Sequence, residues 1–189
     1  MKPISQSAIR NGLLAGFLTI LYTYILYFID PKLMFNPLWA FIPYFLIFPV
    51  FMVVSAKTTR TEHGGFINMG DAFMSAFITG VIAVFLSTMF SFVLQTVIDP
   101  SLEQVAKEAT TEMTVGMMEY FAGDEIDDEQ MDAVLEGLDE ADYAPNLKNT
   151  IVSFCAMAMF GAVPALIIGR VIRRKKDPYA VVDNEEIYR

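Results

Sequence analysis

Histidine, cysteine and tryptophan are nearly absent from this 189-residue chain, since each occurs once. A single cysteine, Cys155, cannot form an intramolecular disulfide, and a single histidine, His63, cannot build a zinc site on its own. Cys155 lies in an apolar stretch, where a free cysteine packs as a small apolar side chain, so we expect it to be buried. His63 is followed by two glycines, which predicts a surface turn and not a catalytic base.

Basic residues are scarce in one part of the chain. Residues 99–148 hold 15 acidic residues against 2 basic ones, a net charge of −13, whereas the rest of the chain carries +4. The overall charge of −9 is therefore a local property of this acidic segment. A nucleic-acid partner needs a basic face, so this charge distribution argues against one.

Four long stretches lack Asp, Glu, Lys, Arg and His, namely residues 12–29, 37–56, 72–98 and 149–169. A helix needs roughly 17–25 apolar residues to cross about 30 Å of hydrocarbon, and each stretch meets this length. The chain is 54% hydrophobic with a mean hydropathy of +0.45. A soluble fold of this size could not bury that much apolar surface. The sequence therefore predicts an all-α integral membrane protein with four transmembrane helices in a single membrane domain.

The basic residues of the short connections predict the orientation of these spans. They precede the first span, follow the second and follow the fourth, at Lys2, Arg10, Lys57, Arg60, Arg170, Arg173, Arg174, Lys175 and Lys176. Because cytoplasmic loops are enriched in Lys and Arg, we expect both termini in the cytoplasm, including a basic tail over 170–189. Residues 30–36 and the acidic segment 99–148 then lie outside.

The acidic segment shows helical periodicity in two parts. The first apolar stripe, capped by Asp99 or Ser101, comprises Leu102, Ala106, Ala109, Met113, Met117 and Tyr120. The second, capped by Asp127, comprises Met131, Val134, Leu135 and Leu138. Gly123-Asp124-Glu125 joins them, which predicts an acidic amphipathic helical hairpin whose stripes face each other or the membrane surface.

Small residues four apart predict close helix crossings, because lipid supplies no hydrophobic drive and packing must hold the helices together. These rows are Gly12 and Gly16, then Ala72, Ala76 and Gly80, then Gly161, Ala165 and Gly169. Prolines 43, 49 and 164 are expected to kink the second and fourth spans. Asn68, with Asp71 three residues later, predicts the N-cap of the third span.

A short sequence motif occurs in both halves of the chain. Ile29-Asp30-Pro31 recurs as Ile98-Asp99-Pro100, each time at the outer end of an odd-numbered span. The match favours either two similar two-helix halves or convergence on a good helix stop, and the sequence alone leaves both open.

The predicted spans carry no Asp, Glu, Lys, Arg or His, which disfavours an ion-coupled transporter or a proton pump. Gln95 is the largest polar residue in them, and hydroxyls expected to bond between helices belong to Thr19, Tyr22, Thr23, Tyr24, Ser87, Thr88 and Ser91. The acids between Asp124 and Asp142 do not follow a calcium-loop pattern, although loose divalent-cation binding stays an alternative. The sequence indicates no catalytic, cofactor or metal site.

Several short motifs resemble a known family. They are Gly12-Leu13-Leu14-Ala15-Gly16, Tyr27-Phe28-Ile29-Asp30-Pro31, Phe35-Asn36-Pro37-Leu38-Trp39, Gly64-Gly65-Phe66-Ile67, Gly70-Asp71-Ala72-Phe73, Val97-Ile98-Asp99-Pro100 and Arg173-Arg174-Lys175-Lys176. Together they are similar to the domain-of-unknown-function family 4199, multi-pass membrane proteins found chiefly in Bacteroidota, from about Ser7 to Lys176. The resemblance implies a bacterial inner-membrane location and no particular reaction or cofactor.

The sequence favours an accessory, scaffold or envelope-sensing protein that acts through protein contacts at the acidic segment. The runner-up is a channel or permease for a neutral or cationic solute, formed by several copies of the chain because four spans enclose little interior. An enzyme is disfavoured, since no acid, base or metal-ligand pair shares one membrane depth.

Overall fold

The computed structural model describes residues 6–122, 127–141 and 143–174. Within these residues the secondary structure is helical, apart from an isolated antiparallel bridge between Ile67 and Arg174. The long helices are α1 (Gln6–Ile29), α3 (Phe48–Glu62), α4 (Met69–Val93), α5 (Leu102–Ala122), α6 (Asp128–Glu140) and α7 (Leu147–Ile172). Shorter pieces are the 3₁₀ helix η1 (Pro31–Met34), α2 (Pro37–Ala40) and the π-helical segments η2 (Pro43–Ile47) and η3 (Leu94–Ile98).

Four helical segments are long and apolar enough to cross a membrane, which confirms the predicted number: Gln6–Ile29, Pro37–Glu62, Met69–Ile98 and Leu147–Ile172. Most of them run past the charge-free stretches seen in the sequence, because a helix can continue into water once it has left the hydrocarbon. Arg10 and Lys57 lie on such extensions and are partly or wholly exposed. Charged residues therefore mark the edge of the apolar zone and not the end of the helix.

The second of these segments is irregular. A proline begins η2, and Pro49 follows at the second residue of α3. Because proline donates no backbone hydrogen bond, it disturbs the α-helical pattern there: Pro43 begins a π-helical segment, and Pro49 lies where the donor is not needed, in the first turn of α3. In the π turn the Phe48 amide reaches back five residues to the carbonyl of Pro43. Pro164 differs, since it lies inside α7 and that helix continues to Ile172.

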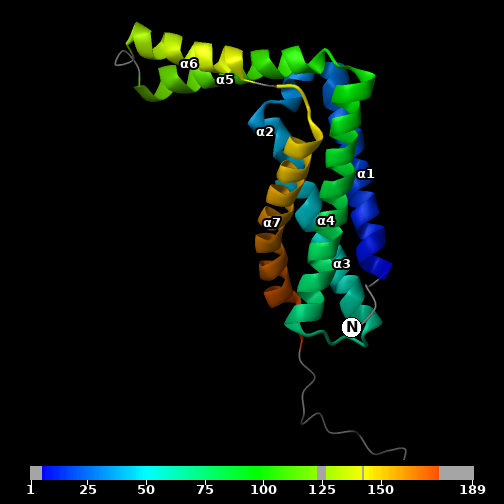
Figure 1. Cartoon of the computed structure of the whole chain (residues 1–189). Helices are drawn as coiled ribbons and strands as arrows, with labels where there is room; N and C mark the ends of the chain where they lie inside the picture. The colour runs from blue at the N-terminus through cyan, green and yellow to red at the C-terminus, as the bar shows by residue number, and fades with distance from the viewer. Residues whose placement is uncertain (1–5, 123–126, 142, 175–189) are drawn as a thin grey trace, which may run out of the picture.

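Helix α4 is the centre of the bundle, and α1, α3 and α7 all pack against it (Figure 1). The small-residue rows do lie at crossings. A Cβ added to Gly12 would stand 2.8 Å from Ile82 Cβ and 3.0 Å from the Thr79 carbonyl oxygen, and one on Gly169 would stand 3.1 Å from Phe73 Cα. Ala72, Ala76 and Ala165 are fully buried. Close backbone approach therefore holds α1 and α7 against α4.

One expectation about the small-residue rows is wrong. At Gly161 an added Cβ would meet only Met52 Cε, at 3.8 Å, so this glycine borders open space and not a crossing. At Gly80, by contrast, an added Cβ would collide with Cε of Met52, so this buried glycine does lie where α3 packs against α4. Cys155 is exposed on α7 and not buried, because that helix turns most of its surface away from the bundle.

The two ends of the bundle differ in charge. The described chain begins and ends at one of them, called here the basic end, where Ile67 and Arg174 exchange backbone hydrogen bonds of 3.1 and 2.9 Å (Figure 1). At this end Asn68 Oδ1 accepts from the Asp71 amide at 2.8 Å, which confirms the predicted N-cap of α4. His63 is exposed in the turn after α3, as predicted. Helices α5 and α6 lie at the opposite end, called here the acidic end.

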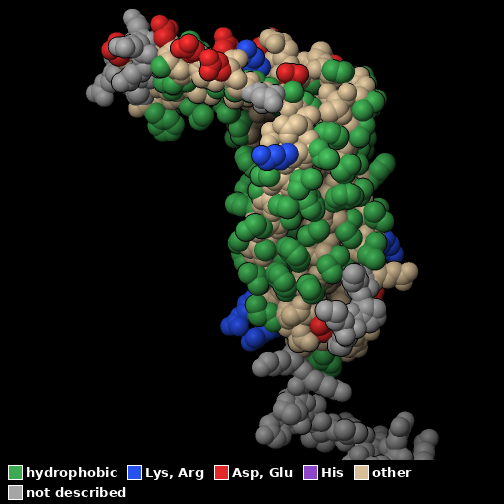
Figure 2. All heavy atoms as spheres, viewed as in Figure 1, with side chains coloured by type: hydrophobic (Ala, Val, Ile, Leu, Met, Phe, Trp, Pro, Cys, Tyr) green, Lys and Arg blue, Asp and Glu red, His purple; other side chains and the backbone are tan. Residues whose placement is uncertain are grey.

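The exterior of the bundle is apolar between its ends (Figure 2). Large hydrophobic side chains stand exposed on every one of the four long segments, for example Phe17 at 62%, Phe45 at 70%, Phe85 at 50% and Phe160 at 66%. A protein in water hides such side chains, whereas a bilayer solvates them.

Candidate functional site: an acidic arm and a hydroxyl-lined recess

Helices α5 (Leu102–Ala122) and α6 (Asp128–Glu140) form what is called here the acidic arm, which crosses the acidic end and projects beyond the bundle (Figure 1). Asp99 starts it. Its Oδ1 accepts from the amide and the hydroxyl of Ser101, and its Oδ2 accepts from the Tyr27 hydroxyl at 2.9 Å. These hydroxyls lower the pKa of Asp99, so they stabilise the turn at neutral pH. That contribution is lost only as the pH falls below the ordinary carboxyl range, through the lowered pKa.

A basic residue ties the arm to the neighbouring loop. Lys32, in η1, places its Nζ 2.6 Å from Glu112 Oε1 and 3.6 Å from Glu108 Oε2, both on α5. The hydrogen bond to Glu112 raises the pKa of Lys32, against the opposing effect of desolvation. Asp30 and Asp99 each accept from the amide two residues on, so the repeated Asp-Pro motif makes the same local turn twice.

The two helices of the arm touch each other through Lys107, whose Nζ lies 3.0 Å from Asp139 Oδ1. At the base of the arm Leu102 is fully buried and Ala106 is 7% exposed, whereas Tyr120 and Phe121 near its tip are more than 80% exposed. In Figure 2 acidic side chains line the outward surface of the arm and apolar ones its underside. The apolar stripe is therefore buried at the bundle and uncovered beyond it.

Two details of the predicted hairpin are not confirmed. Asp127 occupies the N-cap position of α6 but its side chain makes no capping hydrogen bond. The predicted connection, Gly123-Asp124-Glu125, lies outside the described residues.

A cavity of about 410 Å³ opens in the half of the bundle next to the acidic end. Its polar lining comes from α1, the second segment, α4, η3 and α7: Thr19, Tyr22, Thr23, Tyr44, Ser87, Thr88, Ser91, Gln95 and Ser153. No Asp, Glu, Lys, Arg or His is among the described residues that line it. The sequence predicts hydrogen bonds between helices for most of these hydroxyls. The Tyr22 hydroxyl makes one, since it donates to the Trp39 carbonyl of α2 at 2.9 Å, and the hydroxyls as a group line one shared space. Thr19 and Ser87 donate to carbonyls of their own helix.

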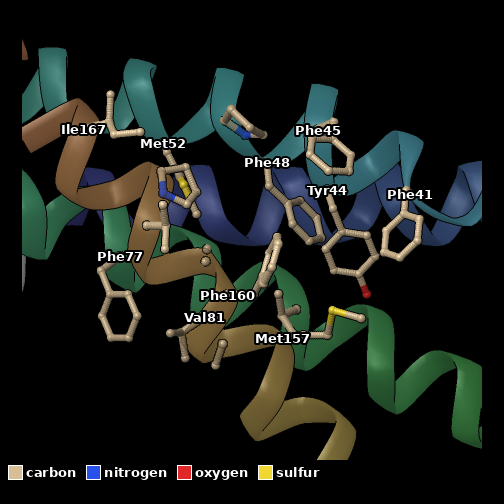
Figure 3. Close-up of a pocket in the computed structure, with 17 residues that line it drawn as sticks. Phe41, Tyr44, Phe45, Phe48, Met52, Phe77, Val81, Met157, Phe160 and Ile167 are labelled. Atoms are coloured by element: carbon tan, nitrogen blue, oxygen red, sulfur yellow. The ribbon is translucent and has the colours of Figure 1, made fainter.

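A second recess, an apolar groove of about 400 Å³, continues from this cavity toward the middle of the bundle. The two share Phe41, Tyr44 and Met157. Aromatic rings from the second segment form one wall, with the Tyr44 and Phe48 centroids 5.0 Å apart, and Met157 and Phe160 of α7 face them (Figure 3). The groove exists because α7 packs on α4 and α3 but packs little, if at all, on α2 and η2.

A family model, described as "Protein of unknown function (DUF4199)", matches residues 10–174. The chain belongs to this family. No curated protein and no solved structure matches the DUF4199 chain. The matched region contains the greater part of all four long segments, the acidic arm and both recesses.

A buried polar cluster lies near the basic end of this DUF4199 chain. The hydroxyl of Ser75 on α4 lies 2.8 Å from those of Ser55 and Thr59 on α3. Thr79 donates to the Ala8 carbonyl of α1 at 3.2 Å. Sequence reasoning missed these residues, because serine and threonine spaced along a helix reveal a cluster only when the facing helices are known.

No group of three or more His, Cys, Asp or Glu side chains in the described ranges could hold a metal ion. The acids of the arm lie along two helices, and two of them, Glu108 and Glu112, are paired with Lys32. What the geometry offers in this DUF4199 chain is therefore a projecting charged surface and an uncharged recess, each suited to binding.

Proposed function

We propose that the chain crosses a bacterial inner membrane four times, with both termini in the cytoplasm and the acidic arm outside. Three features support this: the length of the apolar segments, the apolar exterior, and the placement of basic residues at the end opposite the arm. Exposed Tyr24 and Trp39 near the acidic end suit the interface where aromatic side chains gather.

Thiol labelling tests this orientation. In a Cys155→Ala background, cysteine at the exposed Asp132 of α6 should react with an impermeant reagent in cells whose outer membrane has been opened. Cysteine at the exposed Thr61 should stay protected until the inner membrane is permeabilised. Reaction at Thr61 but not at Asp132 in intact cells would reverse the proposed topology.

We propose further that the chain acts without catalysis, as an accessory, scaffold or envelope-sensing component, and that its acidic arm contacts a protein partner with a basic surface. One observation carries this: the arm projects beyond the bundle while Lys32 and Asp99 hold its base in place. A projecting surface that is already held in place loses less conformational entropy on binding than a flexible segment would. Its charge steers a basic partner and disfavours acidic ones.

A photo-crosslinking residue at Glu136, exposed on α6, tests the contact in cells at native expression level. We expect a discrete protein adduct there and none from the same residue at Lys57, on the basic end. Lys32→Glu replaces attraction to Glu112 by repulsion and should weaken the adduct, and adding Glu112→Lys should restore it. No adduct from Glu136 or from its neighbours on the exposed face of α6 would refute a protein contact. Calcium or magnesium could then be compared with a monovalent salt at the same ionic strength. If the divalent salt changed the structure of the arm more, the arm would bind cations instead.

An oligomeric channel or permease for a neutral or cationic solute is the second candidate, favoured by the uncharged, hydroxyl-lined cavity. The cavity lies in one half of the bundle only. In the other half, toward the basic end, the side chains of Ala15, Met52 and Ala76 are at most 1% exposed. A pathway would therefore need a rearrangement or an interface between copies. Solute flux through liposomes that contain the purified chain separates this function from the first.

A further inference from the structure

The cavity and the groove form one recess whose polarity changes along a single face of α4 and the η3 segment that continues it. Going toward the acidic end, this face presents Phe77, Val81 and Val84 to the groove and then Ser87 or Thr88, Ser91 and Gln95 to the cavity, at steps of three or four residues. At 1.5 Å per residue, the face runs about 27 Å from its apolar to its polar end. A recess of this kind is complementary to a molecule that is apolar at one end and hydrogen-bonding at the other.

The direction of this gradient matches a lipid in the outer leaflet. The polar end adjoins the loop with η1 and α2, at the acidic end where the chain leaves the apolar zone. The apolar end lies at mid-depth, between α3, α4 and α7. A lipid of that leaflet would place its head and its tail in the same order.

The lining also selects the kind of head group. Hydroxyls and the Gln95 amide surround the polar end, without a charged side chain among the described lining residues. The basic residue of the adjoining η1, Lys32, is paired with Glu112 and Glu108 on the arm. A phosphate brought into this cavity would lose water and meet no cation, which is costly. An uncharged head with hydroxyls would exchange hydrogen bonds with the lining.

We propose that this recess binds one neutral lipid with a hydroxyl-bearing head, of the diacylglycerol type, with the head among Thr88, Ser91 and Gln95 and an acyl tail between Phe48 and Phe160. The groove opens beside α7, so the tail can enter from the bilayer. This inference rests on the proposed membrane insertion and is independent of the partner proposed for the arm.

Photo-crosslinking of lipids tests the proposal on the full chain in phosphatidylcholine nanodiscs. The probe is diacylglycerol with a diazirine in one acyl chain, and phosphatidylglycerol with the same acyl chain is the charged comparison. We expect saturable adducts from diacylglycerol that map by mass spectrometry to residues 41–52, 77–84 and 157–167. Excess unlabelled diacylglycerol should remove them, whereas phosphatidylglycerol should label the apolar exterior without saturation.

Variants locate the two ends of the lipid. Gly161→Leu puts a side chain into the groove where an added Cβ meets only Met52 Cε at 3.8 Å, so it should fill the tail site while the bundle keeps its melting temperature. It should lower saturable labelling about tenfold, the loss expected from excluding a pair of methylene groups. Gln95→Leu with Ser91→Ala should remove the preference for diacylglycerol over its di-O-methyl-capped analogue. Val171→Leu, on the exposed exterior of α7 and outside the lining of both recesses, is the matched control and should leave labelling unchanged.

Labelling that does not saturate, that is equal for the two lipids, or that survives Gly161→Leu would overturn the proposal. A covalent dimer in place of lipid adducts, from a photoreactive residue at Val81, would show that a helix of a second copy fills the groove and would overturn it as well. The thiol-labelling pattern is measured separately, so failure of the lipid site and failure of the proposed topology give different results.

Discussion

Leucine in place of Gly12 should destabilise the bundle more than any other single change considered for this protein. Glycine lets α1 approach α4 until an added Cβ would stand 2.8 Å from Ile82 Cβ and 3.0 Å from the Thr79 carbonyl oxygen. The carbonyl belongs to the α4 backbone, so the clash can be relieved only by separating two helices. Overpacking of this kind costs about 1–3 kcal/mol even where side chains can adjust. The measurement is the melting temperature of the purified protein in detergent, followed by its elution from a sizing column.

The control is Gly161→Leu, which makes the same change of volume on α7. There the added side chain enters the groove and meets no backbone, so the melting temperature should stay close to that of the native chain. If both leucine variants melt at the same temperature, the α1–α4 crossing is not the close contact that the structure shows.

Removing the Thr59 hydroxyl should have the second largest effect. Thr59→Val keeps the shape of the side chain but deletes an oxygen that lies 2.8 Å from Ser75 Oγ between α3 and α4. Thr59 is 3% exposed, so water cannot replace the lost partner. Polar bonds between membrane helices contribute about 0.6 kcal/mol on average and up to about 1.7 kcal/mol. We expect a loss within that range, measured by reversible unfolding in mixed micelles.

The neighbouring residue provides the comparison. Thr58→Val is the same chemical change one position earlier, but the Thr58 hydroxyl donates to the Val54 carbonyl of its own helix. It should change the free energy of unfolding little, because no helix pairing depends on it. A double variant, Thr59→Val with Ser75→Ala, should lose less than the two single losses together, since both break one shared hydrogen bond. Strict additivity would contradict the pairing.

The features that sequence predicted well are those fixed by length or by local chemistry. Four stretches free of charge predicted four long helices because the thickness of a bilayer imposes a minimum length. Asn68 with Asp71 predicted a helix start because the capping bond joins residues three apart. Gly12 predicted a close crossing because four-residue spacing keeps it in line with Gly16 on one face of α1.

The features that sequence missed depend on which faces meet. Gly161 lies in the same kind of row as Gly12, yet it borders a groove, because α7 leaves the second segment uncovered at that depth. Ser91 and Gln95 could equally have bonded to a neighbouring helix, and only the arrangement of α1 and α7 around α4 turns them into the lining of a cavity. Cys155 was assigned to the interior because its neighbours are apolar, but in a membrane apolar residues face outward as well.

The π turn at the end of α4 influences the direction in which the arm points around the axis of the bundle. The Asp99 amide donates to the Leu94 carbonyl five residues earlier, at 2.8 Å, so this turn contains one residue more than an α-helical turn. Each residue rotates a helix by about 100°, and everything after the turn is offset by about that angle from the path of an unbroken helix. The direction of the arm around the bundle therefore depends on the number of residues in this turn as well as on the contacts that α5 makes through Leu102 and Glu112. A gain or loss of one residue here would aim the same acidic surface at a different neighbour and would also displace Leu102 from its buried position.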